Sequence, residues 1–217
     1  PEHRIFLQRC CSAEPRCRWL IQDPRAPGIF GAMNQGFAEA APSDWLLFWG
    51  SDDWAAGSTV LAQLVSALEH SASQGTMPDL LVCRGRYAKA HSGVLTRSTE
   101  FQPAGLLSSD AYRRALWLGF SPPHQATLFG PGARRLLARY APGFRLSADL
   151  DYFLHLSIHP GLRVQCLDLE IVHLAVGGVS GQQHQRRLQE VRRAYRRAFA
   201  RFWWIPLIAR YIRRVAS

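Results

Sequence analysis

Residues 44–53 of the 217-residue chain are Asp44-Trp45-Leu46-Leu47-Phe48-Trp49-Gly50-Ser51-Asp52-Asp53, and they decide the expected fold. A continuous apolar run of this length is typical of a parallel strand that is buried on both faces. The run stops at Gly50, and two carboxylates follow. Ligands of open α/β sheets bind outside the carboxyl ends of strands, so Asp52 and Asp53 are candidate binding residues.

Strand and helix patterns alternate on both sides of this stretch. Strands are expected at 18–21, 79–87 and 93–96 and within 162–172, and helices at 29–40, 58–70, 131–140, 147–158 and 182–204. This alternation predicts an α/β fold, with a mostly parallel sheet flanked by helices. Pro206 is expected to end or kink the last helix, because proline has no N–H to donate.

Composition narrows the class of protein. Hydrophobic residues make up 47% of the chain, which is enough to bury a core. No apolar run reaches the roughly 18 residues that a membrane span needs, and no secretory signal opens the chain. The five cysteines fit no zinc-site spacing, which favours reduced thiols and a cytoplasmic location. The chain starts at Pro1, which suggests an origin inside a longer protein or after processing.

The net charge of +10 is concentrated at the carboxyl end. From Arg186 onward there are ten arginines and one acid, Glu190, whereas the rest of the chain is nearly neutral. An apolar stripe runs through the same segment at helical spacing: Leu188, Val191, Tyr195, Ala198 and Phe202. We therefore expect a domain at 1–181 and a basic amphipathic helical tail at 182–217.

Three roles of this tail stay open. It can pack on the domain with a solvated basic face, or lie on an anionic membrane at the inner face of the cell membrane. Trp203 and Trp204 suit the second role, because tryptophan favours the membrane interface. Nucleic-acid binding is disfavoured, since no nucleic-acid-binding module accompanies the basic residues.

The candidate site residues also have ordinary structural explanations. Adjacent carboxylates such as Asp52 and Asp53 repel each other unless a cation or hydrogen-bond donors compensate, and Mg²⁺ and Mn²⁺ favour oxygen ligands. A simple turn accounts for the same pair. Asp149, in the first turn of an expected helix, is favourable there through the helix dipole alone. His124 follows two prolines and can be a hydrogen-bonded loop residue.

Five short motifs, taken together, resemble the family 2 glycosyltransferases of the GT-A fold. In order, they are Gly28-Ile29-Phe30-Gly31-Ala32-Met33-Asn34-Gln35-Gly36, Ser51-Asp52-Asp53, His124-Gln125, Ala148-Asp149-Leu150-Asp151 and Gly177-Gly178-Val179-Ser180. The resemblance covers roughly residues 19–180. It implies an inverting transferase that moves a sugar from a nucleoside-diphosphate sugar to a saccharide or lipid-linked acceptor, in bacterial surface polysaccharide or glycolipid assembly.

The resemblance also implies roles for single residues. Asp53, with Asp52 beside it, matches the residues that hold Mn²⁺ or Mg²⁺ on the diphosphate, and Asp52 also lies near the ribose. Asp149 matches the catalytic base, with Asp151 as the competing candidate. Asn34 matches a position near the donor. His124 and Gln125 match positions that line the donor-sugar and acceptor cleft.

The chain departs from the family pattern at several points. Ala26 stands where the family has an aspartate, the loop before residue 28 is one residue longer, and Gly31 replaces another aspartate. Ala148 stands where the catalytic motif has a glutamate. The family's opening strand and nucleotide-contacting loop have no counterpart in this sequence. A non-catalytic remnant that binds sugar or membrane is therefore the alternative to an active transferase.

Overall fold

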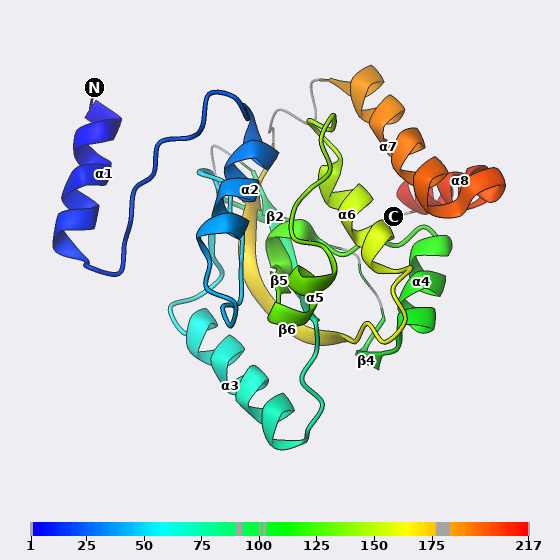
Figure 1. The fold of residues 1–217 in the computed structure, drawn as a ribbon, viewed down its shortest axis with the longest axis horizontal. Helices are drawn as coiled ribbons and strands as arrows, with labels where there is room; N and C mark the ends of the chain where they lie inside the picture. Colours follow the sequence, from blue (N-terminus) through cyan, green and yellow to red (C-terminus); the bar gives the residue numbers. More distant parts are fainter. Residues whose placement is uncertain (1, 90–92, 100, 102, 177–182, 217) are drawn as a thin grey trace.

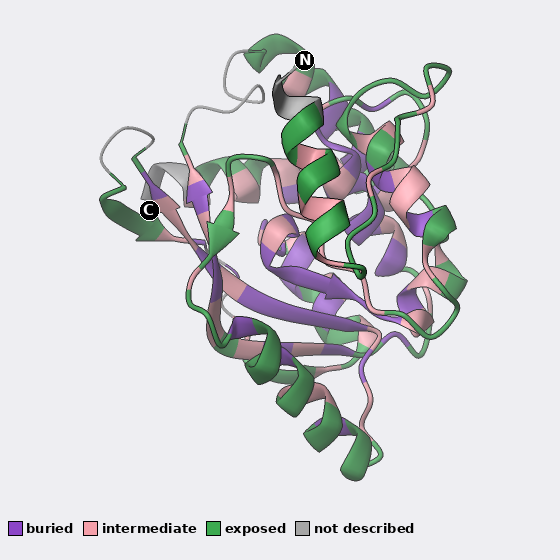
Figure 2. Cartoon of the chain, turned by 90° about the vertical axis from the view of Figure 1, so that its left-hand side faces the viewer, coloured by how far each residue is buried: buried purple, intermediate pink, exposed green. Residues whose placement is uncertain are grey.

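The protein folds as a curled mixed sheet with helices on both faces (Figure 1). This computed structural model describes residues 2–89, 93–99, 101, 103–176 and 183–216. The sheet centres on two long strands, β2 (Leu80–Ala88) and β6 (Val164–Ala175), which run parallel. Figure 2 shows these strands enclosed, with exposed helices outside them. The expected α/β class is confirmed.

Four short strands extend the central pair, and all of them run antiparallel. β3 (Leu95–Ser98) and β5 (Thr127–Phe129) pair with the two halves of β2. β1 (Trp54–Ala55) and β4 (Gly105–Leu107) pair with the two halves of β6. The sheet is therefore mixed rather than mostly parallel. A short connection such as that between β2 and β3 can only return antiparallel, because a parallel pairing needs a long crossover.

The helices separate into two layers because side chains of a strand point alternately to opposite faces. Leu80 and Val82 face the larger core, and Leu81 and Cys83 face the smaller one. The larger core includes side chains of α2 (Ile29–Glu39), α4 (Ser109–Trp117), α5 (Pro131–Leu136), α6 (Ala148–Leu156) and α7 (His184–Phe199). Helix α3 (Val60–Ser73) covers the smaller core.

The remaining elements lie at the two ends of the chain. Helix α1 (Glu2–Ala13) stands at one edge, and an extended segment joins it to α2 (Figure 1). After α7 the chain turns through the 3-10 helix η3 (Ala200–Phe202) into α8 (Trp204–Ala216), beside α7 and α4. A further 3-10 helix, η1 (His124–Ala126), precedes β5.

The expected strand at 18–21 is wrong. This segment is extended but pairs with no strand, and Leu20 and Ile21 are exposed. Side chains of α2 hold the segment instead: Gln35 Nε2 donates to Ile21 O at 3.2 Å, and Glu39 forms an ion pair with Arg18 at 3.6 Å. Hydrophobicity alone therefore did not define a strand, because a strand also needs a neighbouring strand with which to pair.

The expected parallel strand at 45–49 is wrong in its pairing, although it is correct in its packing. The backbone pairs at a single antiparallel bridge, between Leu46 and Phe129. Successive side chains nevertheless alternate between the two cores: Trp45, Leu47 and Trp49 join the smaller core, and Leu46 and Phe48 join the larger one. The apolar run therefore reflects burial on both faces rather than a hydrogen-bonded ladder.

The expected effect of Pro206 is also wrong. The long helix breaks earlier, at Ala200, which has a left-handed backbone with φ of 46°. Pro206 lies in the first turn of α8 and is buried there. A missing N–H costs little in the first turn, because that N–H has no partner within the helix. Among the described residues, no helix is long and apolar enough to span a membrane.

Candidate functional site

The two candidate metal-binding carboxylates lie at the carboxyl ends of the parallel strands. The turn at 50–53 leads into β1, which pairs with β6 at Val172 and His173. Asp53 Oδ2 accepts a hydrogen bond from Gly50 N at 2.7 Å, and the backbone of Ala175, the last residue of β6, also contacts this carboxylate. This is the edge at which ligands bind in open α/β sheets.

Gly50 lets the two carboxylates converge. A Cβ atom on Gly50 would lie 2.8 Å from Asp52 Oδ1, closer than real Cβ contacts, and 3.0 Å from Asp53 Oδ2, tighter than most of them. Both side chains therefore fold back over the same Cα atom. Burial raises the pKa of Asp53, opposed by the hydrogen bond from Gly50 and reinforced by the charge of Asp52. A cation at this turn would offset the burial of the Asp53 carboxylate and its repulsion by Asp52.

The two carboxylates, Asp52 and Asp53, fit a metal ion whose remaining ligands come from a bound substrate. Within the described part of the chain, no three His, Cys, Asp or Glu side chains are grouped closely enough to form a metal cage. Mg²⁺ is commonly held by one or two carboxylates together with substrate phosphates. Asp52 and Asp53 supply such a pair, so they suit a diphosphate-bound Mg²⁺ or Mn²⁺ better than a metal held by protein alone.

The helix η1 connects the turn to the other candidate residues. Trp49, which precedes Gly50, donates its indole N–H to Gln125 O at 2.9 Å. Phe48 stacks on His124 with ring centroids 5.9 Å apart. Because β5 runs antiparallel to β2, η1 lies further toward the carboxyl end of β2 than β5 does. His124 and Gln125 are thus on the same edge of the sheet as Asp53.

His124 is a buried, neutral histidine rather than an open loop residue. Its exposure is 7%, and its Nε2 lies 2.6 Å from Tyr140 Oη. Burial lowers the pKa of His124, while the charge of Asp149 acts in the opposite direction. The same carboxylate contributes to the raised pKa of Tyr140, whose first cause is burial. Asp149 is therefore electrostatically coupled to the buried His124–Tyr140 pair.

Asn34 binds the backbone of Tyr140, whereas His124 contacts its hydroxyl group. Its side chain donates to Tyr140 O at 3.2 Å and accepts from Tyr140 N at 2.7 Å. This two-point bond holds the backbone of the loop before α6 against α2. A hydrogen-bonded path thus runs from Asn34 through Tyr140 to His124, with Asp149 coupled to its last two members. The sequence indicated three of these residues and missed Tyr140.

The two aspartates of α6 occupy different environments. Asp149 is half-buried in the first turn, near His124. Asp151 is only 2% exposed, and both of its oxygens accept from Arg197 Nη1, at 2.8 and 2.7 Å. Burial raises the pKa of Asp151, against the attraction of His155 and Arg197. The arginine partner of Asp151 is therefore on α7.

Glu190 fixes the loop that carries these aspartates, and no sequence pattern indicated it. Its carboxylate is buried and accepts three backbone N–H bonds, from Arg145 at 3.0 Å, Leu146 at 2.7 Å and Ser147 at 3.0 Å. These donors immediately precede α6. Ser147 stands at the N-cap position of α6, but its side chain makes no capping hydrogen bond. Glu190 binds the loop instead.

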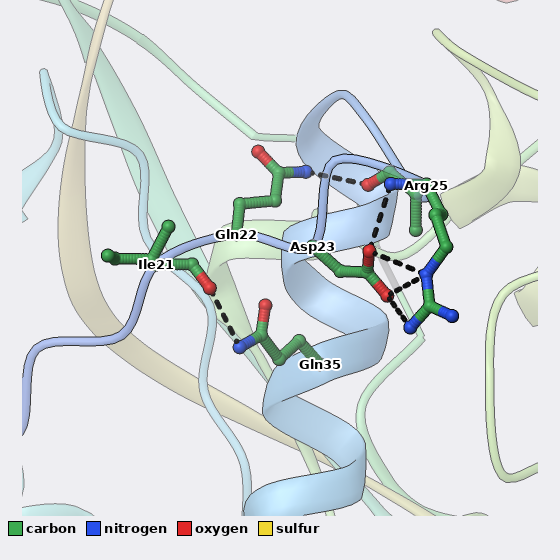
Figure 3. A network of polar contacts seen from close by, with 6 residues as sticks. Ile21, Gln22, Asp23, Arg25 and Gln35 are labelled. Atoms are coloured by element: carbon green, nitrogen blue, oxygen red, sulfur yellow. Dashed lines mark hydrogen bonds and ion pairs between the residues drawn. The ribbon is translucent and has the colours of Figure 1, made fainter.

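The packing of the loop before α2, which Figure 3 draws, explains one departure from the resembled family, the glycine at position 31. Gln22 Nε2 donates to Ala26 O at 2.9 Å and to Gly28 O at 2.6 Å, which folds the loop onto the helix. A Cβ atom at Gly31 would lie 1.9 Å from Ala26 O, so no side chain fits there. Gly36 likewise meets Phe48, at 3.1 Å. Both glycines thus serve packing.

The other polar contact in this loop is local. Arg25 pairs with Asp23, and their closest ion-pair atoms are 3.0 Å apart at the exposed surface (Figure 3). The hydrogen bonds from Arg25 lower the pKa of Asp23. The candidate motif Gly177–Ser180 lies outside the described residues.

Comparisons with known proteins support the fold. No protein-family model and no curated protein matches the chain. Among solved structures, S. aureus TarS, a glycosyltransferase, matches with a TM-score of 0.54 and 12% identity, over 78% of this chain and 27% of the TarS chain. TarS 1–349 in complex with UDP-GlcNAc matches with a TM-score of 0.55 and 12% identity, over 78% and 46% of the two chains.

The chain thus spans less than half the length of the TarS chains that it matches. At this level of identity the likeness concerns the fold. The greater part of the described chain has the fold of a glycosyltransferase.

Proposed function

We propose that this protein is a metal-dependent, inverting glycosyltransferase of the family 2 type, which uses a nucleoside-diphosphate sugar as donor. The observation that carries the proposal is the convergence of Asp52 and Asp53 at the carboxyl ends of β2 and β6, in a fold shared with TarS, which was crystallised with UDP-GlcNAc. Bacterial surface polysaccharide or glycolipid assembly at the inner face of the cell membrane is the proposed setting.

The proposed reaction is a single displacement at the anomeric carbon of the donor sugar. Asp149 takes the proton of the acceptor hydroxyl while the acceptor oxygen forms its bond to the anomeric carbon. The bond from that carbon to the diphosphate oxygen breaks, and the diphosphate leaves with the electron pair. Attack opposite the leaving group inverts the anomeric configuration. Mg²⁺ or Mn²⁺ held at Asp52 and Asp53 would offset charge on the leaving diphosphate.

The geometry supports Asp149 over Asp151 as the base. Asp151 is enclosed and engaged by Arg197, so neither of its oxygens is free to receive a substrate proton. Asp149 is half-buried and coupled to His124, whose neighbour Gln125 accepts a hydrogen bond from Trp49, next to the turn that carries Asp52 and Asp53. Burial lowers the pKa of His124, which favours the neutral imidazole. A neutral His124 places no positive charge beside the Asp149 carboxylate.

Binding and turnover test the proposal separately. Calorimetric titration of the intact protein with UDP and UDP-GlcNAc should give stronger binding with Mn²⁺ or Mg²⁺ than without, and Asp53→Ala should remove the difference. Equal affinity with and without metal would exclude the metal role. Absence of any nucleotide binding would favour the non-catalytic remnant.

Turnover is measured with a matched pair of substitutions. Asp149→Asn should lower single-turnover rates by about 10²–10⁴-fold and leave donor affinity nearly unchanged, since the base acts on the acceptor. Asp151→Asn makes the same change at the other aspartate of α6. In the fraction of this variant that remains folded, the single-turnover rate should fall much less. The opposite ranking would assign the base to Asp151.

A further inference from the structure

An apolar groove lies between α7 and α8 and is open to solvent. Its volume is about 340 Å³. Six apolar side chains line it: Leu188, Trp203, Leu207, Ile208, Tyr211 and Ile212. Ile208 is 49% exposed and Ile212 is 63% exposed, so the groove leaves large aliphatic surface in water. Groups of exposed apolar side chains of this kind mark interaction sites.

The groove is a fixed part of the fold. The opposite face of α7 is buried in the larger core through Val191, Tyr195 and Phe199. Helix α8 is held against the end of α4, where Arg213 Nε donates to Leu118 O at 2.9 Å. The middle of the stripe seen in the sequence therefore packs on the domain. The exposed apolar surface lies instead where α7 meets α8.

Arginines border the groove on α7. Arg192 belongs both to the groove and to a neighbouring hollow lined by Arg193, Arg196, Arg197 and Gln189. The guanidinium groups of Arg192 and Arg196 lie 5.6 and 4.4 Å from the Trp203 ring centroid. The one acid of α7, Glu190, is buried and bound by backbone N–H groups, so it does not neutralise this surface.

We infer that the α7–α8 surface docks onto an anionic lipid membrane. The side chains that line the groove suit the acyl boundary, and the adjacent arginines suit lipid phosphates, which is the arrangement of an interfacial amphipathic helix. A second copy of the chain would bring arginines opposite arginines. A nucleic acid offers no apolar phase for Ile208 and Ile212. The inference goes beyond the proposed transferase activity and does not depend on nucleotide binding.

Sedimentation with lipid vesicles tests the inference. The intact protein should bind vesicles that contain about a third phosphatidylglycerol and should not bind neutral phosphatidylcholine vesicles. Binding should weaken between low and high salt, because the charge attraction is screened. The pair Arg192→Gln and Arg196→Gln should lower the partition coefficient about 30-fold. The pair Ile208→Asn and Ile212→Asn should lower it at least about 10-fold.

Matched controls separate local binding from general effects. Leu61→Asn with Val65→Asn removes two exposed apolar residues from α3, and Arg97→Gln with Arg135→Gln removes two exposed arginines elsewhere. Both control pairs should bind vesicles as the original protein does, and circular dichroism should show all variants folded.

Three results would overturn the inference. The first is equal binding of the α7–α8 variants and the controls. The second is a dimer that dissociates in the Ile208 and Ile212 variant. The third is binding to an RNA duplex without binding to anionic vesicles.

Discussion

Replacing Glu190 by alanine should destabilise the protein strongly, because this carboxylate closes the loop before α6. Three backbone N–H groups point at it, and its side chain is only 8% exposed. The substitution leaves these donors without their acceptor and opens a polar gap between α6 and α7. Since Asp149 lies in the first turn of α6, just beyond this loop, the loss should reach the candidate base.

The size of the effect follows from the character of the bonds. A hydrogen bond to a charged group contributes about 1.5–3 kcal/mol, and leaving a buried donor unsatisfied costs about 1–3 kcal/mol. Water can reach part of the loop, because Arg145 is exposed, so the three costs do not simply add. We expect Glu190→Ala to lower the free energy of unfolding by about 3–5 kcal/mol, in the range for removing one partner of a buried charged contact.

Arg186 provides the matched control. It forms an ion pair with Glu190 at 3.2 Å, but its side chain is largely solvated. Solvent screens the exposed guanidinium of Arg186, and Glu190 keeps its three N–H donors, so Arg186→Gln should cost under about 1 kcal/mol. Urea unfolding at constant pH, followed by circular dichroism, measures both variants. Equal losses in the two variants, or a loss under about 1 kcal/mol for Glu190→Ala, would refute the assignment of Glu190 to the loop N–H groups.

Three further substitutions test the site and the packing. Gly50→Ala should displace both carboxylates and lower UDP affinity in Mn²⁺ about 10-fold by calorimetry, whereas Gly57→Ala, with no atom near its Cβ, should not. Gly119→Ala should lower the free energy of unfolding, measured in urea, by about 2–4 kcal/mol, because the added Cβ would meet the backbone nitrogen of Arg210 in α8. As the control, Gly105→Ala has the same positive-φ strain without this contact and should cost about 1 kcal/mol. Burial lowers the pKa of His124, so the unfolded chain takes up a proton below about pH 6.5 that the native protein resists. Stability should therefore fall as pH falls through this range, by up to about 1.4 kcal/mol per unit, and urea unfolding at several pH values should show a shallower fall for His124→Gln.

The sequence predicted the elements that have strong local patterns. The helix expected at 29–40 is α2, and the strand expected at 79–87 is β2, shifted by one residue. Each of these segments carries its own periodicity, so its conformation can be inferred without its neighbours. The pairing of strands depends on partners far along the chain. The 45–49 segment shows this clearly, since its apolar pattern records burial but not its single bridge to Phe129.

The same distinction applies to the candidate site. Asp53, His124 and Asp149 stand in short motifs, and the fold connects all three to one edge of the sheet. Tyr140 and Glu190 have no motif. Tyr140 acts through hydrogen bonds to a residue 106 positions away, and Glu190 through bonds to residues up to 45 positions away. Such contacts leave no local signature, because any polar residue that reaches the correct place can make them.

Helix α7 joins the two proposals through its opposite faces. Glu190 and Arg192 are two residues apart and so point about 200° from each other around the helix. Glu190 faces inward and fixes the loop before Asp149, whereas Arg192 faces the outer groove. A membrane bound to the outer face would therefore leave the inner contacts intact. Substitutions at Arg192 and Arg196 should weaken vesicle binding without lowering turnover on a soluble acceptor, while Glu190→Ala should lower turnover even when no membrane is present.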